Sequence, residues 1–518
     1  MVRMHSTSAV LIGLAVAALA VAPPAAQQFG SIAFPTSGAP AAQAAFLTGV
    51  KALHNFQFDE AAVAFQEAEK ADPGFAMAYW GEAMSHNHPL WAQQDVAKAK
   101  AALDKLAPTH EARVAKAALP KEKAFLEAQN LLYFAPGDKL ARDTAYSGAM
   151  AKMHDQWPDD HEVAIFYALS LLGTVRPGDA GFRRQALAAS IAEKVFAANP
   201  QHPGAAHFII HAFDDPDHAP LALDAANAYA KIAPSAAHAL HMPSHIYVQR
   251  GMWKEVVASN IDAYKAATDL NAKMKLPEGR EDFHTLGWLT YGNLMLGNVD
   301  AAAKNVEAAK AAADRNPDNR GIRDGYLGMR ARYIQESGTW EKIALPAETA
   351  SAAGDHAAMP GMAMGGGGGV SEGAASWIYI AGVSAAKLGD QATADAALAR
   401  LAAIREQAGR GGNAYAAKPH AIREKELGAI VKWAKGQKDA ALADAKAAAE
   451  IEATMAAPSG PPDPIKPAFE LYGELLAEAG QDKAAAAAFE QALLRTPNRT
   501  PSVRGLATAT ARLKTSMH

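Results

Sequence analysis

The chain has 518 residues, of which 50% are hydrophobic but only 7% aromatic, so alanine supplies much of its apolar content. Its formal net charge of -4 argues against nucleic acid or an acidic lipid surface as a partner. The chain contains no cysteine, which excludes a disulfide framework, a lipid-anchored cysteine and thiolate ligands for a metal.

Residues 1–26 are typical of a secretory signal peptide. Arg3 supplies the positive charge, and the uncharged apolar run from Ala9 to Ala22 is too short to cross a bilayer. We expect cleavage between Ala22 and Gln27. No later segment is apolar enough to span a membrane, so the sequence predicts a soluble mature protein in the periplasm or outside the cell.

From residue 27 onward the sequence repeats with a period of 34 residues. In the first unit (42–75) and the last (466–499), small residues stand at positions 8, 20 and 27, and a proline stands at position 32. Small residues let the two helices of a unit approach closely, and the proline ends the second helix. This is the pattern of the tetratricopeptide repeat (TPR), a helix–turn–helix unit.

Less regular units bring the total to about nine, with an irregular insertion at roughly 92–158. They begin near Ala76, His161, Pro203, Ala237, Phe283, Ala375 and Ile422. The sequence therefore predicts an all-α fold, an α-solenoid whose TPR-like units form a superhelix with a concave groove.

Two biased segments interrupt the repeats. Residues 354–373 are rich in methionine and glycine, and their glycine run disfavours a helix. We interpret this segment as a linker between an N-terminal array (27–353) and a C-terminal array (374–518). Residues 457–467 are rich in proline and lead stiffly into the last unit.

Histidines recur at equivalent positions of neighbouring units. His207 and His211 stand at positions 5 and 9 of one unit, and His241 and His245 stand at the same positions of the next. Residues four apart share one helix face, and packed helices lie about 8–10 Å apart, so the two pairs can meet. The other recurring histidines are His238 and His284 at position 2, and His54 and His88 at position 13.

These histidines predict a transition-metal site, with copper or zinc as the cofactor. Imidazole suits both metals, and without cysteine the site must use nitrogen and oxygen ligands. Pro243 lies between His241 and His245, where it is expected to bend the helix or delay its start. In the linker, His356 lies near several methionines, which would suit Cu(I) if the segment is more than a disordered spacer.

Packing in the core and binding of an organic ligand remain alternative roles for the clustered histidines. Six other histidines are expected to be packed in the core or exposed to solvent: His110, His154, His161, His202, His218 and His420. Tyr79, Trp80 and Trp91 are expected in the core or in the groove wall. Candidate carboxylates that orient a ligand or act as acid or base are Glu162, Asp214, Asp215, Glu470 and Glu474.

The histidine-bearing stretches resemble a widespread bacterial family of exported TPR proteins. The matching stretches are residues 53–61, 78–91, 202–216, 238–253 and 462–476. The resemblance implies that the eight recurring histidines are family features, and it implies a site more than a particular activity. Gly287 departs from the family pattern, because relatives tend to carry an acidic residue at this position. If that acidic residue is a metal ligand in the relatives, the site of this chain is weaker without it.

The favoured interpretation is an exported solenoid that binds copper or zinc through histidines on its concave face, as a metalloenzyme or a metal-handling protein. A zinc protease is disfavoured, because the stretch from His207 to His211 lacks the glutamate of H-E-x-x-H, and no serine-hydrolase or nucleotide motif is present. The rival is a metal-free scaffold that binds a peptide or protein in its groove. A small molecule in the groove is a further possible partner.

Overall fold

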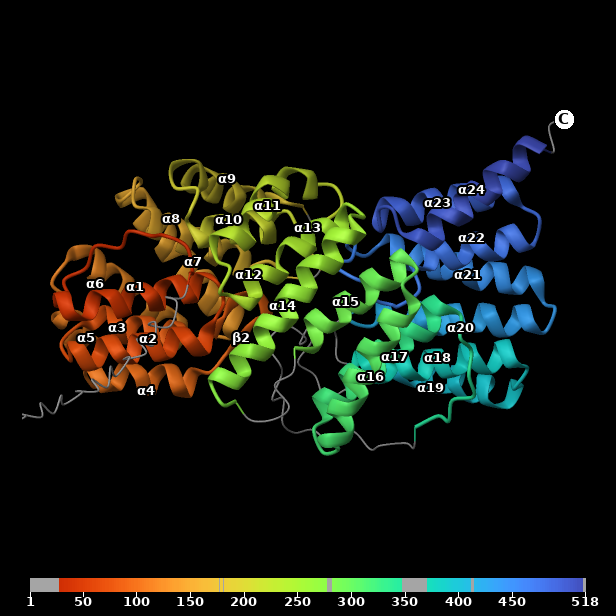
Figure 1. The fold of residues 1–518 in the computed structure, drawn as a ribbon, viewed down its shortest axis with the longest axis horizontal. Helices are drawn as coiled ribbons and strands as arrows, with labels where there is room; N and C mark the ends of the chain where they lie inside the picture. Colours follow the sequence, from red (N-terminus) through yellow and green to blue (C-terminus); the bar gives the residue numbers. More distant parts are fainter. Residues whose placement is uncertain are drawn as a thin grey trace, which may run out of the picture.

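The computed structural model describes residues 28–176, 178–179, 181–276, 282–346, 370–410 and 414–515. The predicted signal peptide lies outside these residues, as does the linker up to residue 369. Within the described residues the chain is almost entirely α-helical, and its helices follow one another along an elongated molecule (Figure 1). Helix α1 (Pro40–His54) and helix α24 (Thr500–Thr515) lie toward opposite ends.

The N-terminal half consists of short helices joined by tight turns. These are α2 (Phe58–Ala71), α3 (Ala76–Met84), α4 (Val96–Leu106), α5 (His110–Lys116), α6 (Pro120–Phe134), α7 (Lys139–Gln156), α8 (His161–Gly173), α9 (Arg183–Ala198), α10 (Pro203–Ala212), α11 (Leu223–Ile232), α12 (Ala237–His241) and α13 (Pro243–Gln249). Two 3-10 turns, η1 (Pro89–Trp91) and η2 (Ala219–Ala222), and an antiparallel pair of two-residue strands, β1 (Asn87–His88) and β2 (Gln93–Gln94), complete this half.

The helices of the second half are longer on average. They are α14 (Trp253–Lys273), α15 (Phe283–Leu296), α16 (Val299–Arg315), α17 (Arg320–Ser337), α18 (Glu372–Leu388), α19 (Gln391–Arg410), α20 (Lys418–Ala434), α21 (Lys438–Ala453), α22 (Ala468–Glu478) and α23 (Asp482–Arg495). None of the described helices has both the length and the apolar character that a membrane crossing requires.

Consecutive helices pack as hairpins, and each hairpin packs on the next. Five of the repeat units predicted from the sequence begin at the first residue of a helix: Ala76, His161, Pro203, Ala237 and Phe283. The small residues at repeat positions explain the close packing; a side chain at Gly49, for example, would meet the ring of Phe65. The predicted all-α TPR-like solenoid is confirmed.

Helices α17 and α18, on either side of the undescribed segment, pack directly against each other. Gly373 permits this contact, because a Cβ at that position would overlap the carbonyl oxygen of Asp324. Ala331 and Ile334 of α17 share a buried apolar cluster with Ile378 of α18. Helix α18 begins at Glu372, so the last two residues of the predicted linker, Glu372 and Gly373, belong to the helix.

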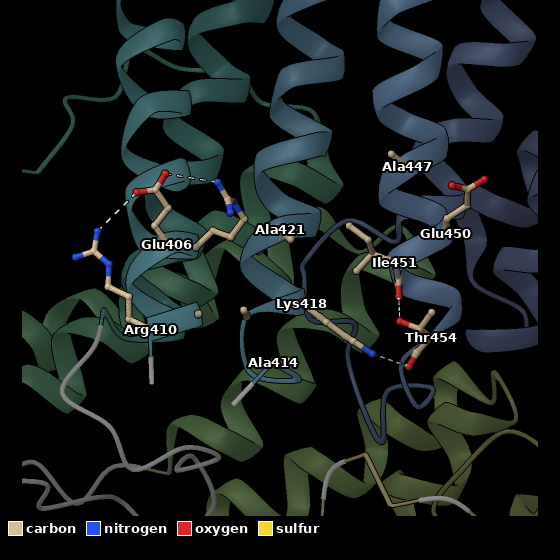
Figure 2. Close-up of a pocket in the computed structure, with 12 residues that line it drawn as sticks. Glu406, Arg410, Ala414, Lys418, Ala421, Ala447, Glu450, Ile451 and Thr454 are labelled. Carbon is tan, nitrogen blue, oxygen red and sulfur yellow. Dashed lines mark hydrogen bonds and ion pairs between the residues drawn. The ribbon is translucent and has the colours of Figure 1, made fainter. Parts of the chain in front are cut away.

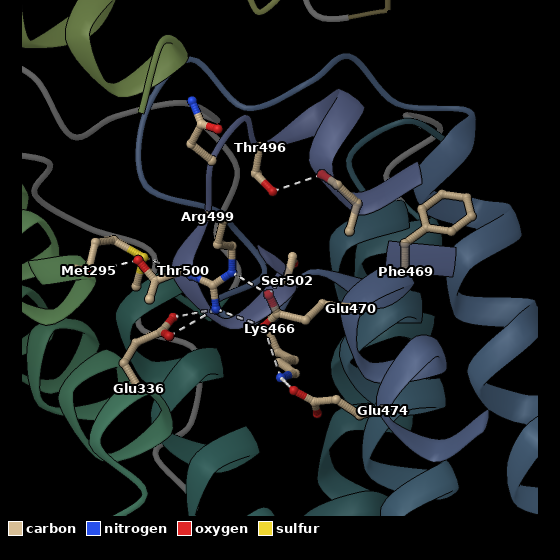
Figure 3. A network of polar contacts seen from close by, with 12 residues as sticks. Met295, Glu336, Lys466, Phe469, Glu470, Glu474, Thr496, Arg499, Thr500 and Ser502 are labelled. Atoms are coloured by element: carbon tan, nitrogen blue, oxygen red, sulfur yellow. Dashed lines mark hydrogen bonds and ion pairs between the residues drawn. The ribbon is translucent and has the colours of Figure 1, made fainter. Parts of the chain in front are cut away.

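A buried ionic network also joins the two predicted arrays (Figure 3). The Arg499 guanidinium, before α24, donates to both carboxylate oxygens of Glu336 on α17 at 2.8 and 2.9 Å. It also donates to Glu470 on α22 at 2.8 and 2.9 Å. Lys466 donates to Glu470 at 2.9 Å and to Glu474 at 2.6 Å. Buried charges are tolerated when they are paired in this way.

Candidate metal centre

Six histidines from four neighbouring helices converge near the middle of the molecule. Helix α10 carries His207 and His211, α12 carries His238 and His241, α13 carries His245 and α15 carries His284. Their ligand atoms form two groups, within each of which all atoms lie within 4.8 Å of one another. We call them trio A (His207, His211 and His238) and trio B (His241, His245 and His284).

Local sequence explains how so many rings meet. On α10, a spacing of four residues places His207 and His211 on one face. Between His241 and His245, Pro243 interrupts the helix, so that α12 ends at His241 and α13 restarts at Pro243. Proline lacks the amide hydrogen that would continue the helix ladder, which accounts for the break.

In trio B the three Nε2 atoms face one another. His241 Nε2 lies 3.1 Å from His245 Nε2 and 2.9 Å from His284 Nε2. In trio A, His207 Nε2 lies 3.0 Å from His238 Nε2, and His211 Nε2 is buried with no hydrogen-bond partner. Nitrogen ligands about 2.0–2.1 Å from a shared ion lie roughly 3 to 4 Å apart, so these separations are close to those of a metal site.

The opposite ring nitrogens are committed to oxygen atoms. His241 Nδ1 lies 2.7 Å from Asn260 Oδ1, whose amide nitrogen in turn donates to the Val256 carbonyl. His245 Nδ1 lies 2.6 Å from Asp214 Oδ2. His207 Nδ1 lies 2.6 Å from the main-chain oxygen of His54. Because these oxygens only accept, each Nδ1 carries the proton.

This arrangement fixes the tautomers. A neutral imidazole that is protonated at Nδ1 presents a lone pair at Nε2. When both rings are neutral, the Nε2 lone pairs of His241 and His245 therefore face each other at 3.1 Å and repel unless a cation lies between them. Histidines that bind a metal usually donate their other ring N–H to a carboxylate, a carbonyl or water in this way.

Burial favours the neutral, metal-binding form of the rings. It lowers the pKa of His207 and of His284 to about 3. Burial, together with neighbouring histidines, lowers the pKa of His211, His238 and His241 well below the usual value. Neutral imidazoles bind a metal without first losing a proton.

Aromatic rings enclose the two trios. The Phe56 ring lies 4.4 Å from the His207 ring and 5.3 Å from the His238 ring, measured between centroids. Trp91 lies 6.3 Å from His238, in keeping with a wall position. On the other side, the Trp288 ring lies 4.3 Å from His245 and 5.0 Å from His241.

A segment that lies more than 200 residues downstream of Gln249 contacts Trp288. The side chain of Gln249 donates to the Pro458 carbonyl at 2.8 Å and to Asp214 Oδ1 at 3.4 Å. A Cβ on Gly460 would overlap the indole of Trp288, so this glycine permits the close approach. The proline-rich segment 457–467 therefore packs against Trp288, whose ring contacts trio B, and the repeat pattern did not predict this contact.

His54 lies beside the six-histidine cluster rather than in it. Its Nε2 lies 2.8 Å from Glu162 Oε2, and His202 Nε2 lies 3.2 Å from Glu162 Oε1. His202 Nδ1 accepts from the Ala205 amide, so its Nε2 carries the proton that Glu162 accepts. Although burial raises the pKa of Glu162, interactions with His54 and His202 hold it at about 2. Hydrogen bonds link these three side chains, whose ligand atoms also lie within 4.8 Å of one another, and His54 Nδ1 is buried with no hydrogen-bond partner among the described residues.

Other predicted site residues lie elsewhere. His88 stacks on Phe58, with ring centroids 3.9 Å apart. Asp215 accepts from His218 Nδ1, at 2.8 Å, rather than from a clustered histidine. Glu470 and Glu474 belong to the Arg499 and Lys466 network, and Asp214 alone of the five candidate carboxylates contacts the cluster.

The remaining histidines and aromatic residues have local roles. His110 pairs with Glu127, at 2.7 Å. Trp80 and Tyr79 are buried in the core. Gly287 lies one turn after His284, and a Cβ at that position would meet nothing within 4 Å. Asn260 is a hydrogen-bond partner of the cluster that the sequence did not indicate, because it lies on the second helix of its unit.

A surface cavity of about 790 Å³ lies away from the histidines, among α19, α20 and α21 (Figure 2). Its charged lining residues are paired locally. Arg405 lies 2.5 Å from Glu424, Arg410 lies 3.9 Å from Glu406, and Lys418 donates to the Thr454 carbonyl at 3.2 Å. The cavity therefore offers no concentrated charge to a ligand.

No protein-family model and no curated protein matches the chain. Among solved structures, it is similar to the TPR domain of P58(IPK), with 13% identity over 92% of this chain and 99% of that one, at a TM-score of 0.22. A Rap protein complexed with competence and sporulation factor shows 13% identity over 76% and 99%, at 0.34. The Cut9–Hcn1 hetero-tetramer of APC/C shows 11% identity over 92% and 78%, at 0.34. Scores this low carry no argument about function.

Proposed function

We propose that this protein is an exported TPR-like solenoid that binds a transition metal, copper or zinc, through its clustered histidines. The observation that carries the proposal is the set of facing Nε2 lone pairs in trio B. Asn260 and Asp214 hold the protons of His241 and His245 on the far sides of the rings. A metal ion converts the resulting repulsion into coordination.

The chemistry of such a site follows from its donors. Three imidazoles leave a four-coordinate ion one open position, which is the arrangement of catalytic rather than closed structural sites. That position suits binding or activation of a small molecule, so the proposal includes metalloenzymes as well as metal-handling proteins. The periplasmic or secreted location is part of this proposal and follows from the N-terminal sequence.

The scaffold alternative makes a different demand on the same residues. A groove that binds an extended peptide needs side chains that reach solvent, whereas His207 and His241 are 0% and 1% exposed. Buried imidazoles with facing lone pairs contribute little to a peptide-binding surface. Without a ligand, their repulsion destabilises the folded protein. This favours the metal over the peptide at this site.

Titration of demetallated protein with Cu(II) and Zn(II) tests the proposal. We expect tight, stoichiometric binding by the wild type, and loss of the metal bound by trio B in His241→Ala and in the less buried His284→Ala. His110→Ala is the matched control, because its imidazole pairs with Glu127 outside the cluster. Circular dichroism of each variant separates lost binding from lost folding. If the folded wild type neither binds more of either metal nor binds it more tightly than folded His284→Ala, the proposal is wrong.

A further inference from the structure

We infer that the six histidines form a pair of copper sites, one in each trio, with one open position on each ion for a shared small ligand such as dioxygen. This inference rests on the proposed function and specifies the number of ions, the element and the class of ligand.

The positions of the ligand atoms favour two ions over one. A single octahedral ion about 2.1 Å from each nitrogen would keep all six ligand atoms within about 4.2 Å of one another. Instead, a limit of 4.8 Å divides the six histidines into two groups of three. The trios are nevertheless neighbours, since the ring centroids of His211 and His245 lie 6.1 Å apart and those of His238 and His241 lie 6.4 Å apart.

The charge of the surroundings favours copper. The six candidate ligands are imidazoles, which bind a metal as neutral donors, and of the candidate carboxylates only Asp214, which accepts from His245, contacts them. Two Zn²⁺ ions would bring four positive charges into this buried region, whereas two Cu(I) ions bring two. Burying uncompensated charge is costly, so the reduced copper pair fits this donor set better. Imidazole is a suitable ligand for copper.

Three protein ligands for each ion leave room for an exogenous one. The Phe56 ring lies against trio A and the Trp288 ring lies against trio B, so both limit the size of a molecule that can approach the ions. This favours a small ligand. Dioxygen meets this requirement, and two adjacent Cu(I) ions supply the electrons it accepts. Each Cu(I) loses one electron and becomes Cu(II). Dioxygen takes up these two electrons and binds both ions, and no proton is needed.

Copper content and magnetic coupling test the inference on the full chain. After anaerobic loading with Cu(I), we expect two copper ions per chain. Exposure to dioxygen should give an intense charge-transfer absorption and little electron paramagnetic resonance signal, because two bridged Cu(II) ions couple their spins. His211→Ala and His284→Ala should each retain one ion, which gives a normal signal after oxidation. His88→Ala, whose ring stacks on Phe58, should retain the coupled pair.

The outcomes distinguish this inference from the proposed function. One copper per wild-type chain, or two ions that give the full signal of two independent spins, would overturn the paired site while leaving metal binding intact. Tight binding of zinc with no stable copper loading would overturn the choice of element. Absence of binding by either metal would overturn both proposals.

Discussion

At the residue scale, the site depends on which ring nitrogen of each histidine carries the proton. Asp214 and Asn260 hold the protons of His245 and His241 at Nδ1, and each bond also fixes the plane of its ring. An acceptor with a negative charge makes the attached imidazole more basic and so strengthens its bond to a metal. Asp214 should therefore contribute to affinity without touching the ion.

Asp214→Ala should weaken metal binding about 10- to 100-fold, which is the usual effect of removing such an outer partner. Asp215→Ala is a closely matched control, because the adjacent carboxylate bonds to His218 and not to the cluster. Competition titration against a chelator of known affinity measures both variants. Equal affinities for Asp214→Ala and Asp215→Ala would show that the Asp214 bond has no influence on the ligands.

The sequence predicted part of this cluster for a physical reason. A period of 34 residues repeats the direction of a side chain, so the two histidine pairs were expected to converge on one site. The structure brings the pairs side by side but divides them, with His207 and His211 in trio A and the second pair in trio B. His54 and His88 share the same period but lie outside the trios, because the His54 ring turns toward Glu162 and the His88 ring stacks on Phe58. Equivalent repeat positions set backbone direction, whereas neighbouring side chains decide where each ring points.

At the element scale, helix starts were predictable and the path of the irregular segment 457–467 was not. Small residues and prolines act locally, which is why the beginnings of α3, α8, α10, α12 and α15 agree with the repeat pattern. Contact of this segment with Trp288 and Gln249 depends instead on how the whole superhelix curves. No local periodicity encodes such a contact.

Gly460→Ala should destabilise the protein by about 1–3 kcal/mol, the usual cost of forcing extra volume into a packed site. The added methyl would overlap Trp288, so the indole fluorescence should change as well. Gly148→Ala provides a control of opposite sign, because that glycine lies within α7 with nothing within 4 Å of the added methyl. It should stabilise the protein by roughly 0.5–1 kcal/mol. Denaturant unfolding that showed equal stability for both variants would contradict the close packing at Gly460.

At the scale of the whole molecule, the Arg499 network determines how α15, α17, α22 and α24 are held together. The guanidinium joins Glu336 to Glu470, which are 134 positions apart, and it also lies 3.3 Å from the hydroxyl of Tyr291 on α15. Glu470 and Glu474 were predicted from the sequence as candidate site carboxylates. Their long-range partners place them instead in the Arg499 network, which forms the joint between the two predicted arrays. Sequence spacing could not identify these partners.

The pKa of Glu470 makes this joint sensitive to acid. Burial raises that pKa, but Arg499 and Lys466 outweigh burial and hold it at about 2, against an ordinary value of 4.5. A carboxyl whose pKa is lowered in the folded state stabilises the protein above its unfolded pKa, and this stabilisation is lost as the pH falls toward the folded value. This stabilisation is therefore fully present at neutral pH and is lost as the pH falls from about 4.5 toward 2.

Glu470→Gln should therefore unfold at lower denaturant concentration than the wild type at neutral pH, by about 3 kcal/mol or more, because removing one partner leaves buried charge uncompensated. The difference should shrink as the pH falls, because protonation removes the same charge from the wild type. Glu490→Gln, on the exposed side of α23, should follow the wild type throughout. Denaturant unfolding of the three proteins from neutral pH down to about pH 2 provides the measurement. A constant gap between Glu470→Gln and the wild type across that range would mean that the charge of Glu470 does not stabilise the joint.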